Sequence, residues 1–174
     1  MPVSGSRFRH HLPWPGLLLA GILQAGCAST GPERSEGRPG YGDPNAASAL
    51  SNEVLMRAIS LVGTPYRYGG NSPEGGFDCS GLVDYVFLDA AGLRLPRSTR
   101  ELIELDAPEV RRDRLLPGDL VFFNPGGGSA SHIGIYVGED RFVHAPSAGG
   151  TVRLDTLQIE YWNQAYKGAK RVLR

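Results

Sequence analysis

A cysteine at the start of a predicted helix is the feature that most constrains this chain. Cys79 lies in the segment Phe77–Gly81, and the apolar residues that follow it recur at helical spacing on the same face: Leu82, Val83, Val86, Phe87 and Ala90. The helix is expected to end at Gly92. Unpaired N–H groups and the positive end of the helix dipole favour a thiolate in the first turn. The motif predicts either a shielded nucleophile or a small buried core cysteine, and both stay open at this point.

Length and charge narrow the class of protein. A chain of 174 residues is long enough for one domain with a proper core, and two domains are not expected. Its 18 Lys and Arg residues balance its 18 Asp and Glu residues, so no strong field attracts nucleic acid. We therefore expect no nucleic-acid partner and a partner that is recognised through local chemistry. A monomer is expected as well.

The N-terminal segment has the pattern of an export signal. Basic residues precede the apolar stretch Leu17–Leu23, and small residues then precede Cys27. The stretch is far shorter than the ~20 residues that a permanent membrane span needs. The small residues before Cys27 resemble the bacterial lipobox, although Gln24 stands where an aliphatic residue is usual. We predict a signal peptide over residues 1–26 and a membrane-attaching lipid on Cys27, with ordinary signal cleavage nearby as the alternative.

Lipidation of Cys27 would leave Cys79 as the remaining thiol, because the chain has two cysteines. An exported protein meets an oxidising environment, where a lone thiol is a liability unless it is used. This argument favours a functional Cys79. The alternative is a disulfide between Cys27 and Cys79, which requires the N-terminus to reach back to the domain.

Composition divides the rest of the chain into a linker and a domain. Residues 27–45 are rich in Gly, Pro, Ser and charge, which predicts a flexible, lipid-anchored linker, and the folded domain is expected over residues 46–174. A helical stripe opens the domain with Leu50, Val54, Ala58, Leu61 and Val62. The glycine-rich loop over residues 69–76 lacks the Lys of a P-loop and predicts tight turns with close backbone approach. Residues 98–101 match a capping box, which predicts a short helix to about residue 105.

The second half of the domain changes to short β-type runs separated by turn residues. These runs cover residues 120–123, 133–137, 142–145, 152–154 and 169–173. One more helical turn is expected within residues 155–166. Helices followed by an antiparallel meander predict an α+β domain.

Two histidines, His132 and His144, fall in the hairpin of the second and third runs. We expect a three-residue loop over residues 138–140, which puts both histidines on one face of the sheet. The expected pairs are Val137 with Arg141, Tyr136 with Phe142 and Gly134 with His144. Gly134 would leave space beside His144. A two-residue loop would shift the register by one and send the two rings to opposite faces.

Cys79, His132 and His144 together predict nucleophilic catalysis. Cys79 attacks, His132 acts as general base and then protonates the leaving amine, and His144 orients His132. A zinc site is the rival interpretation, because all three are legitimate zinc ligands. The sequence has no HExxH motif and no paired cysteines, and a helix N-terminus suits a thiolate better than a cation, so we expect no metal.

Six motifs in order resemble the NlpC and p-sixty cell-wall cysteine peptidases. The motifs are Thr64–Gly70, Phe77–Gly81, Leu95–Arg97, Pro117–Leu120, His132–Gly138 and Phe142–Ala145. The resemblance covers nearly all of residues 46–174. One departure is the Gly126–Ser129 insert before His132, which bears on substrate specificity.

The resemblance implies a papain-like fold in which the Cys79 helix packs on an antiparallel sheet of about five strands. It implies a peptidoglycan endopeptidase without a cofactor, which cuts stem peptides, typically between γ-D-glutamate and a diamino acid. Cys79 would be the nucleophile, His132 the base and His144 the third polar residue. The tyrosine that matches Tyr66 lines the site in relatives and helps to position the oxyanion, as the backbone N–H of Cys79 could also do. A core aromatic is the alternative for Tyr66.

The resemblance also bears on substrate binding and location. Residues that match Asp78 and Ser80 bind the free amino end of the stem peptide in some relatives; a helix cap is the alternative, and for Asp78 we expect both roles. Ala28 after Cys27 resembles outer-membrane lipoproteins of Gram-negative bacteria, which predicts a periplasm-facing enzyme of the cell envelope. Two other functions stay open: an inactive peptidoglycan-binding or envelope-assembly module, and an acyl transferase that uses the same thiol.

Overall fold

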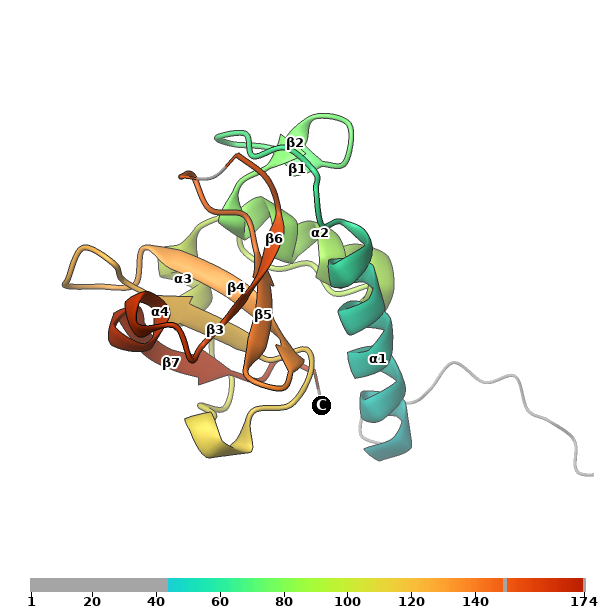
Figure 1. Ribbon diagram of the computed structural model, residues 1–174. Coiled ribbons are helices and arrows are strands. Elements are labelled where there is room, and N and C mark those ends of the chain that lie inside the picture. The colour runs from blue at the N-terminus through green and yellow to red at the C-terminus, as the bar shows by residue number, and fades with distance from the viewer. Residues whose placement is uncertain (1–43, 149, 174) are drawn as a thin grey trace, which may run out of the picture. The chain divides into compact units, whose positions relative to one another are not determined.

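Two helices on one face of a five-stranded antiparallel sheet form the frame of the protein (Figure 1). The computed structural model describes residues 44–148 and 150–173. The predicted signal peptide, the lipid site at Cys27 and nearly all of the linker lie outside the described residues. Within residues 44–148 and 150–173, no helix is long and apolar enough to cross a membrane.

The first helix, α1 (Pro44–Ser60), carries the expected apolar stripe. Val54 and Ala58 are fully buried, and Leu61 is buried just beyond the last turn. Val62, which the stripe also included, is exposed because the helix has already ended. The stripe packs α1 against the second helix and against the sheet.

The second helix, α2 (Cys79–Ala91), begins and ends as the sequence predicts. At its N-terminus, Asp78 Oδ1 accepts a hydrogen bond from the Gly81 N–H at 2.6 Å, which satisfies one of the unpaired donors of the first turn. At its C-terminus, Gly92 adopts a left-handed conformation with φ of 65°, and its N–H donates to the Leu88 carbonyl. Both ends are therefore defined by local chemistry.

The sheet has the strand order β6-β5-β4-β3-β7 and is antiparallel throughout. Its strands are β3 (Leu120–Phe123), β4 (His132–Gly138), β5 (Arg141–His144), β6 (Arg153–Thr156) and β7 (Tyr166–Lys170). The last strand was expected at 169–173 but begins three residues earlier. The reason is that α4 (Glu160–Ala165), the expected extra helical turn, runs directly into it.

The hairpin between β4 and β5 differs from the expected geometry at its tip. The observed pairs are Ile135 with Val143, Tyr136 with Phe142 and Gly138 with Arg141. The turn is the two-residue kind, because Glu139 and Asp140 both have positive φ, 52° and 55°. The predicted three-residue loop and the predicted pairing of Val137 with Arg141 are therefore wrong.

A β-bulge next to the turn corrects the register. The pairing shifts between Tyr136 and Gly138, which inserts one extra residue into β4. The predicted pairing of Tyr136 with Phe142 is confirmed, and Gly134 does leave space beside His144: a Cβ on Gly134 would come within 3.3 Å of the His144 Cβ. The bulge thus keeps the histidines of both strands on one face.

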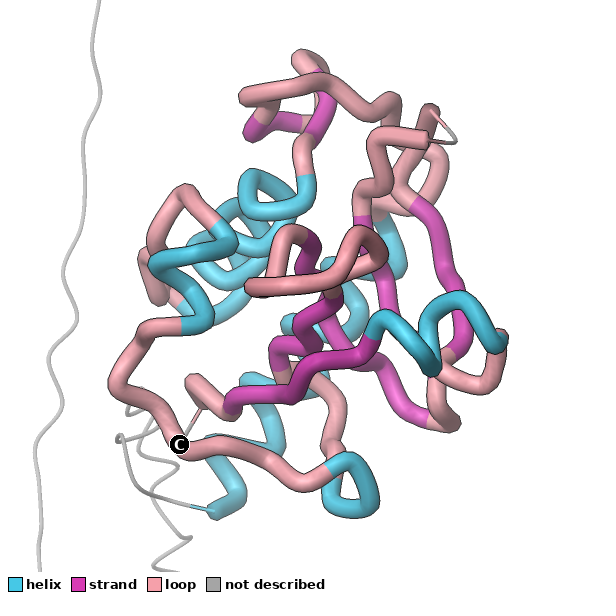
Figure 2. Tube along the Cα trace, turned by 90° about the vertical axis from the view of Figure 1, so that its left-hand side faces the viewer, coloured by secondary structure: helices cyan, strands magenta, loops and turns pink. Residues whose placement is uncertain are grey.

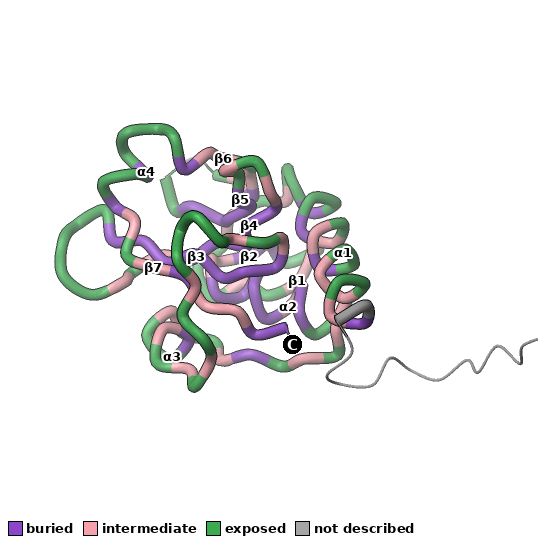
Figure 3. Tube along the Cα trace, turned by 90° about the horizontal axis from the view of Figure 1, so that it is seen from below, coloured by how far each residue is buried: buried purple, intermediate pink, exposed green. Residues whose placement is uncertain are grey.

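Alternate residues of the strands build two apolar clusters, one on each face of the sheet. The helix-side cluster joins α1 and α2 to the sheet through Val54, Leu82, Val86, Leu120, Phe122, Ile133, Ile135 and Val143. The far-side cluster contains Val121, Phe123, Tyr136, Phe142, Leu157 and Trp162. Burial on both faces explains why the central strands are buried along almost their whole length (Figure 3).

The glycine-rich loop forms a small hairpin of β1 (Asn71–Ser72) and β2 (Gly76–Phe77), which lies at the top of the views in Figures 1 and 2. The predicted close approach is confirmed. A Cβ on Gly81 would overlap the Gly70 carbonyl and lie 2.6 Å from Arg97 Nη1. Only glycine lets the start of α2 touch this loop.

A third helix, α3 (Thr99–Ile103), is shorter than expected and has the Ser98 half of the predicted capping box. The Ser98 hydroxyl accepts from the Glu101 N–H at 3.2 Å and lies 2.6 Å from the Glu101 carboxylate. A 3₁₀ turn, Arg112–Arg114, was not predicted.

Candidate active site

Cys79 is the first residue of α2 and packs partly buried against the helix-side cluster. It is a free cysteine. Its Sγ lies 3.7 Å from Thr99 Oγ1 and faces the backbone N–H groups of Ser80 and Ile133. Because Ile133 directly follows His132, the sulfur lies beside the beginning of β4.

The resting protonation state of this site is neutral. Burial raises the pKa of the Cys79 thiol, and the Asp78 carboxylate adds to the shift against hydrogen bonds that lower it. Burial also lowers the pKa of His132 to about 3, and His144 acts in the same direction. Burial therefore works against the thiolate expected from the helix N-terminus, and the raised pKa keeps the Cys79 thiol protonated at neutral pH.

The two histidines form a hydrogen-bonded pair. His132 Nε2 lies 2.7 Å from His144 Nδ1, and the rings meet nearly edge-on at 77° with centroids 5.0 Å apart. Trp162 stacks on the His132 ring at 5.6 Å and meets the fully buried His144 ring edge-on at 4.9 Å. The structure therefore brings together the two histidines that the sequence singled out and fixes both rings against a tryptophan.

Asp155 on β6 extends this chain of hydrogen bonds, and sequence reasoning missed it. Its Oδ2 accepts from His144 Nε2 at 2.9 Å, Trp162 Nε1 at 2.8 Å and Arg153 Nε at 3.0 Å. Partial burial works to raise the pKa of Asp155, but the hydrogen bonds from Trp162 and His144 lower it overall. Asp155 is thus ionised at neutral pH.

The anion of Asp155 sets the tautomers of both histidines. A carboxylate can only accept, so His144 carries its hydrogen on Nε2 and presents a lone pair at Nδ1. That lone pair accepts from His132, whose hydrogen is then on Nε2. His132 Nδ1 is left with its lone pair free, which is the form that a general base needs.

The same geometry argues against the zinc interpretation. The Nδ1 lone pair of His144 points at His132 Nε2, and His144 Nε2 donates to Asp155, so neither nitrogen of His144 is available to a metal. Among the described residues, no group of three His, Cys, Asp or Glu side chains is arranged to hold a metal ion.

Tyr66 lies partly buried against the helix-side cluster and close to the sulfur. Burial raises the pKa of its phenol, and the nearby acidic groups of Cys79 and Asp78 raise it further. The hydroxyl therefore remains a hydrogen-bond donor at neutral pH. The packing of the ring on the core is therefore observed, and a role of the Tyr66 hydroxyl at the oxyanion stays a prediction.

Asp78 and Ser80 are both engaged in the local structure. Asp78 caps α2 through Oδ1, and its Oδ2 accepts from the Gly69 N–H at 2.9 Å. The Ser80 hydroxyl is buried, 3.1 Å from Asp78 Oδ1 and 2.7 Å from the Arg97 carbonyl. The helix-cap role of Asp78 is therefore observed, and a role in substrate binding stays a prediction.

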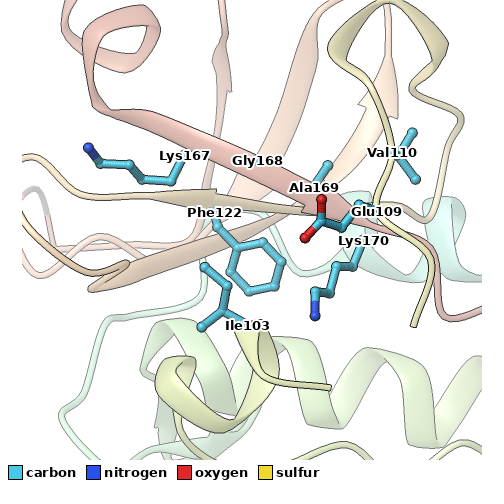
Figure 4. Close-up of a pocket in the computed structure, with 8 residues that line it drawn as sticks. All are labelled: Ile103, Glu109, Val110, Phe122, Lys167, Gly168, Ala169 and Lys170. Atoms are coloured by element: carbon cyan, nitrogen blue, oxygen red, sulfur yellow. The ribbon is translucent and has the colours of Figure 1, made fainter. Parts of the chain in front are cut away.

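Thr99, the side-chain partner of the sulfur, was expected only as the first residue of α3. The chain just after that helix is tied to the sheet, because Lys170 Nζ donates to the Leu105 carbonyl at 2.6 Å. Figure 4 shows Phe122 and Ile103, the last residue of α3, pointing toward each other below β7. These two residues line a cavity of about 140 Å³ between α3 and the sheet. No pattern in the sequence distinguishes Thr99 from an ordinary capping-box residue.

The buried histidines make the stability of the fold depend on pH. Burial lowers the pKa of His144 to about 4, against about 6.5 in an unfolded chain. Between these values the unfolded state binds more protons, so stability falls as pH falls through this range. We expect the free energy of unfolding in urea to drop by about 2 kcal/mol from pH 7 to pH 5 for one such histidine.

The matched control is the variant His144→Asn, which has no titrating ring at this position. Its unfolding free energy should change less between pH 7 and pH 5 than that of the wild type. An equal slope in both proteins would show that His144 is not the source of the pH dependence.

A cysteine at a helix N-terminus and a hydrogen-bonded histidine pair on an antiparallel sheet place the chain in the papain-like class. Residues 63–171 match the NlpC/P60 family, and the chain belongs to this family. The predicted family and α+β fold are thereby confirmed. A crystal structure of an NlpC/P60 family protein from Bacillus cereus ATCC 10987 superimposes with a TM-score of 0.65 and 29% identity, over 71% of this chain and 40% of that one.

Two curated relatives come from Escherichia coli (strain K12). The murein DD-endopeptidase MepH is 46% identical over 122 residues, which are 69% of this chain and 45% of MepH. The probable endopeptidase NlpC is 36% identical over 157 residues, 90% of this chain and 97% of NlpC. The matched part of the chain thus spans about half the length of MepH and nearly all of NlpC.

Proposed function

We propose that this protein is a peptidoglycan endopeptidase that hydrolyses peptide bonds of stem peptides by a cysteine mechanism. The observation that carries the proposal is the hydrogen-bonded chain His132–His144–Asp155, which begins at the residue before Ile133, whose backbone N–H faces the Cys79 sulfur. The relatives add support, because MepH is named a murein endopeptidase and NlpC a probable endopeptidase.

In this mechanism, the neutral pair of Cys79 and His132 reacts in one coordinated step. The Cys79 sulfur attacks the scissile carbonyl carbon while its proton moves to His132 Nδ1. The imidazolium that forms is stabilised through His144 by the Asp155 carboxylate. The oxyanion receives hydrogen bonds from the Cys79 backbone N–H and the Tyr66 hydroxyl, which its raised pKa keeps protonated.

Collapse of the oxyanion breaks the carbon–nitrogen bond, and His132 gives its proton to the leaving amine. The product is a thioester on Cys79. Water then attacks the thioester with His132 as base, which releases a carboxylate and restores the thiol.

Asp78, whose side chain is 16% exposed, would bind the free amino end of the stem peptide from its position in the helix cap. The Ser80 hydroxyl would hold the Asp78 carboxylate in place for this contact.

Two bonds of the stem peptide are candidates. The resemblance of the motifs implies the bond between γ-D-glutamate and a diamino acid, whereas the name of MepH points to a bond between two D-centres. In both, the diamino acid supplies the leaving amine. We place the γ-D-glutamyl bond first, and product analysis distinguishes the two.

The deciding experiment incubates purified peptidoglycan with the enzyme in heavy-oxygen water and identifies the products by mass spectrometry. We expect a new amine on the diamino acid and heavy oxygen in the new carboxylate. Enzyme alkylated at its thiol is the control. Tight binding to wall fragments without new amines would instead indicate a binding module, and an amine adduct of the acyl group would indicate an acyl transferase.

For location, we propose an envelope lipoprotein that works in the periplasm. The support is the predicted signal over residues 1–26, the lipobox-like sequence before Cys27 and Ala28 after it, which favours the outer membrane. Mass spectrometry of the mature N-terminus in wild type and Cys27→Ala tests the lipid. An unmodified N-terminal peptide in the wild type would contradict it.

A further inference from the structure

A cavity of about 440 Å³ opens beside His132 on the side of Trp162. Its lining includes Ser131, His132, Ser147, Arg153, Tyr161 and Trp162. The volume is in the usual range for a pocket that holds a small ligand or one residue of a larger one. The cavity therefore offers a binding site in direct contact with the histidine of the proposed mechanism.

Arg153 gives this cavity its charge. Of the described residues that line it, Arg153 is the only one that carries a charge at neutral pH, since burial keeps His132 neutral. The guanidinium uses Nε and Nη2 to bind Asp155. Its Nη1 makes no hydrogen bond within the described residues, and 40% of the side chain is exposed. One edge of the arginine is thus free, and a carboxylate is the group that matches it best.

The remaining walls fit an aliphatic chain with polar ends. Tyr161 is 56% exposed at the cavity and meets the buried Trp162 ring edge-on at 4.8 Å. The hydroxyl of Ser147 is on an exposed residue of the rim. An aliphatic segment can lie along the two aromatic rings while its charged end reaches Arg153.

We propose that this cavity binds the residue that leaves with the new amine, and that Arg153 recognises a free carboxylate on that residue. The inference rests on the proposed function, in which His132 protonates the leaving amine and therefore faces the leaving side. A diamino acid with a second carboxyl group keeps that carboxylate free whichever candidate bond is cut. The substrate class is thus a stem peptide with a diaminodicarboxylic acid, not one with a lysine-like diamino acid.

Arg153 also binds the Asp155 carboxylate. This structural role predicts a different effect on the rates than recognition of a substrate carboxylate does. If Arg153 only supported Asp155, its replacement would slow every substrate by the same factor. If Arg153 binds a substrate carboxylate, its replacement lowers the rate only for the substrate that carries this carboxylate. A pair of substrates that differ in this single group separates the two roles.

The test uses two synthetic stem peptides, one with the free side carboxylate on the diamino acid and one with that carboxylate as a neutral amide. We expect the wild type to prefer the carboxylate about tenfold to a hundredfold in kcat/KM, mainly through KM. Arg153→Gln should bring the ratio close to one, and Arg153→Lys should keep part of it. Arg141→Gln, which removes an exposed arginine paired with Glu139 outside the cavity, should leave the ratio unchanged.

Two results overturn the inference while leaving the proposed function intact. In one, the wild type cuts both peptides equally well. In the other, Arg153→Gln lowers both rates by the same factor and keeps the preference. Failure of the wild type to cut either peptide would be a failure of the proposed function itself, and the inference would fall with it.

Discussion

Replacing Cys79 with alanine is expected to lower kcat for stem-peptide hydrolysis by about 10⁴-fold or more. Alanine retains the helix start but cannot form the thioester, and none of the neighbouring groups supplies another nucleophile of that strength. The purified variant should still bind wall fragments, because Asp78, Tyr66 and Arg153 remain. Initial rates on a defined stem peptide and binding by isothermal calorimetry measure the two effects separately.

The matched control is the other cysteine. Cys27→Ala should leave the rate on a soluble peptide unchanged, because the proposed lipid determines where the enzyme acts and not how it cuts. Residual turnover of Cys79→Ala within tenfold of the wild type would show that the thiol is not the nucleophile.

Replacing Asp155 with asparagine is expected to lower kcat by about 10²-fold to 10⁴-fold with little change in KM. The amide oxygen can still accept hydrogen bonds from Trp162 and Arg153, so the local structure is largely kept. The negative charge that stabilises the His132 imidazolium is lost, and the positive charge of Arg153 is left uncompensated. Steady-state rates measured across pH test this charge role.

A purely structural role for Asp155 predicts a different pattern. In that case Asp155→Asn would keep kcat and lose only stability, as judged by urea unfolding. Asp113→Asn is the control, since Asp113 is an exposed carboxylate paired with Arg111 far from the histidines in sequence, and its removal should affect neither kcat nor the pH profile.

The sequence predicts the elements whose signals are local. The local signals are the cap of α2 at Asp78, the end of α2 at Gly92, the cap of α3 at Ser98 and the run of β3. Each depends on residues within a few positions of one another, and each appears in the structure. Cys79, His132 and His144 could be singled out because their residue types are rare in this chain. The proximity of the two histidines then followed from one hairpin.

Asp155 could not be predicted in this way, because its partners depend on a register between strands. Arg153 pairs with His144 across β5 and β6, and this places Asp155 one step along the same face. The segment that joins the two strands, residues 145–152, contains Pro and Gly residues that indicate a turn, but a connection of this length does not fix the register between the strands. Trp162 belongs to a separate helix, α4. The contacts of Asp155 with His144, Arg153 and Trp162 therefore form only when the strands and α4 come together in the folded domain.

The protonation state of the Cys79 thiol could not be predicted from the sequence either. The helix position of Cys79 is visible in the sequence pattern, but the burial that raises its pKa, and the hydrogen bonds from Thr99 and Ile133 that work against this shift, exist only in the folded domain. Helix dipoles can be inferred from one segment, whereas burial requires the whole domain.

The bulge beside the β4–β5 turn links the length of an exposed tip to the alignment of the site. Glu139 and Asp140 contact solvent, and surface turns of this kind usually accept insertions and deletions readily. Here the insertion or deletion of one residue would place His132 and His144 on opposite faces of the sheet, unless the position of the bulge shifted to compensate. For anyone who wishes to add a tag, a label or a fused domain, this hairpin tip is the wrong site, however accessible it looks.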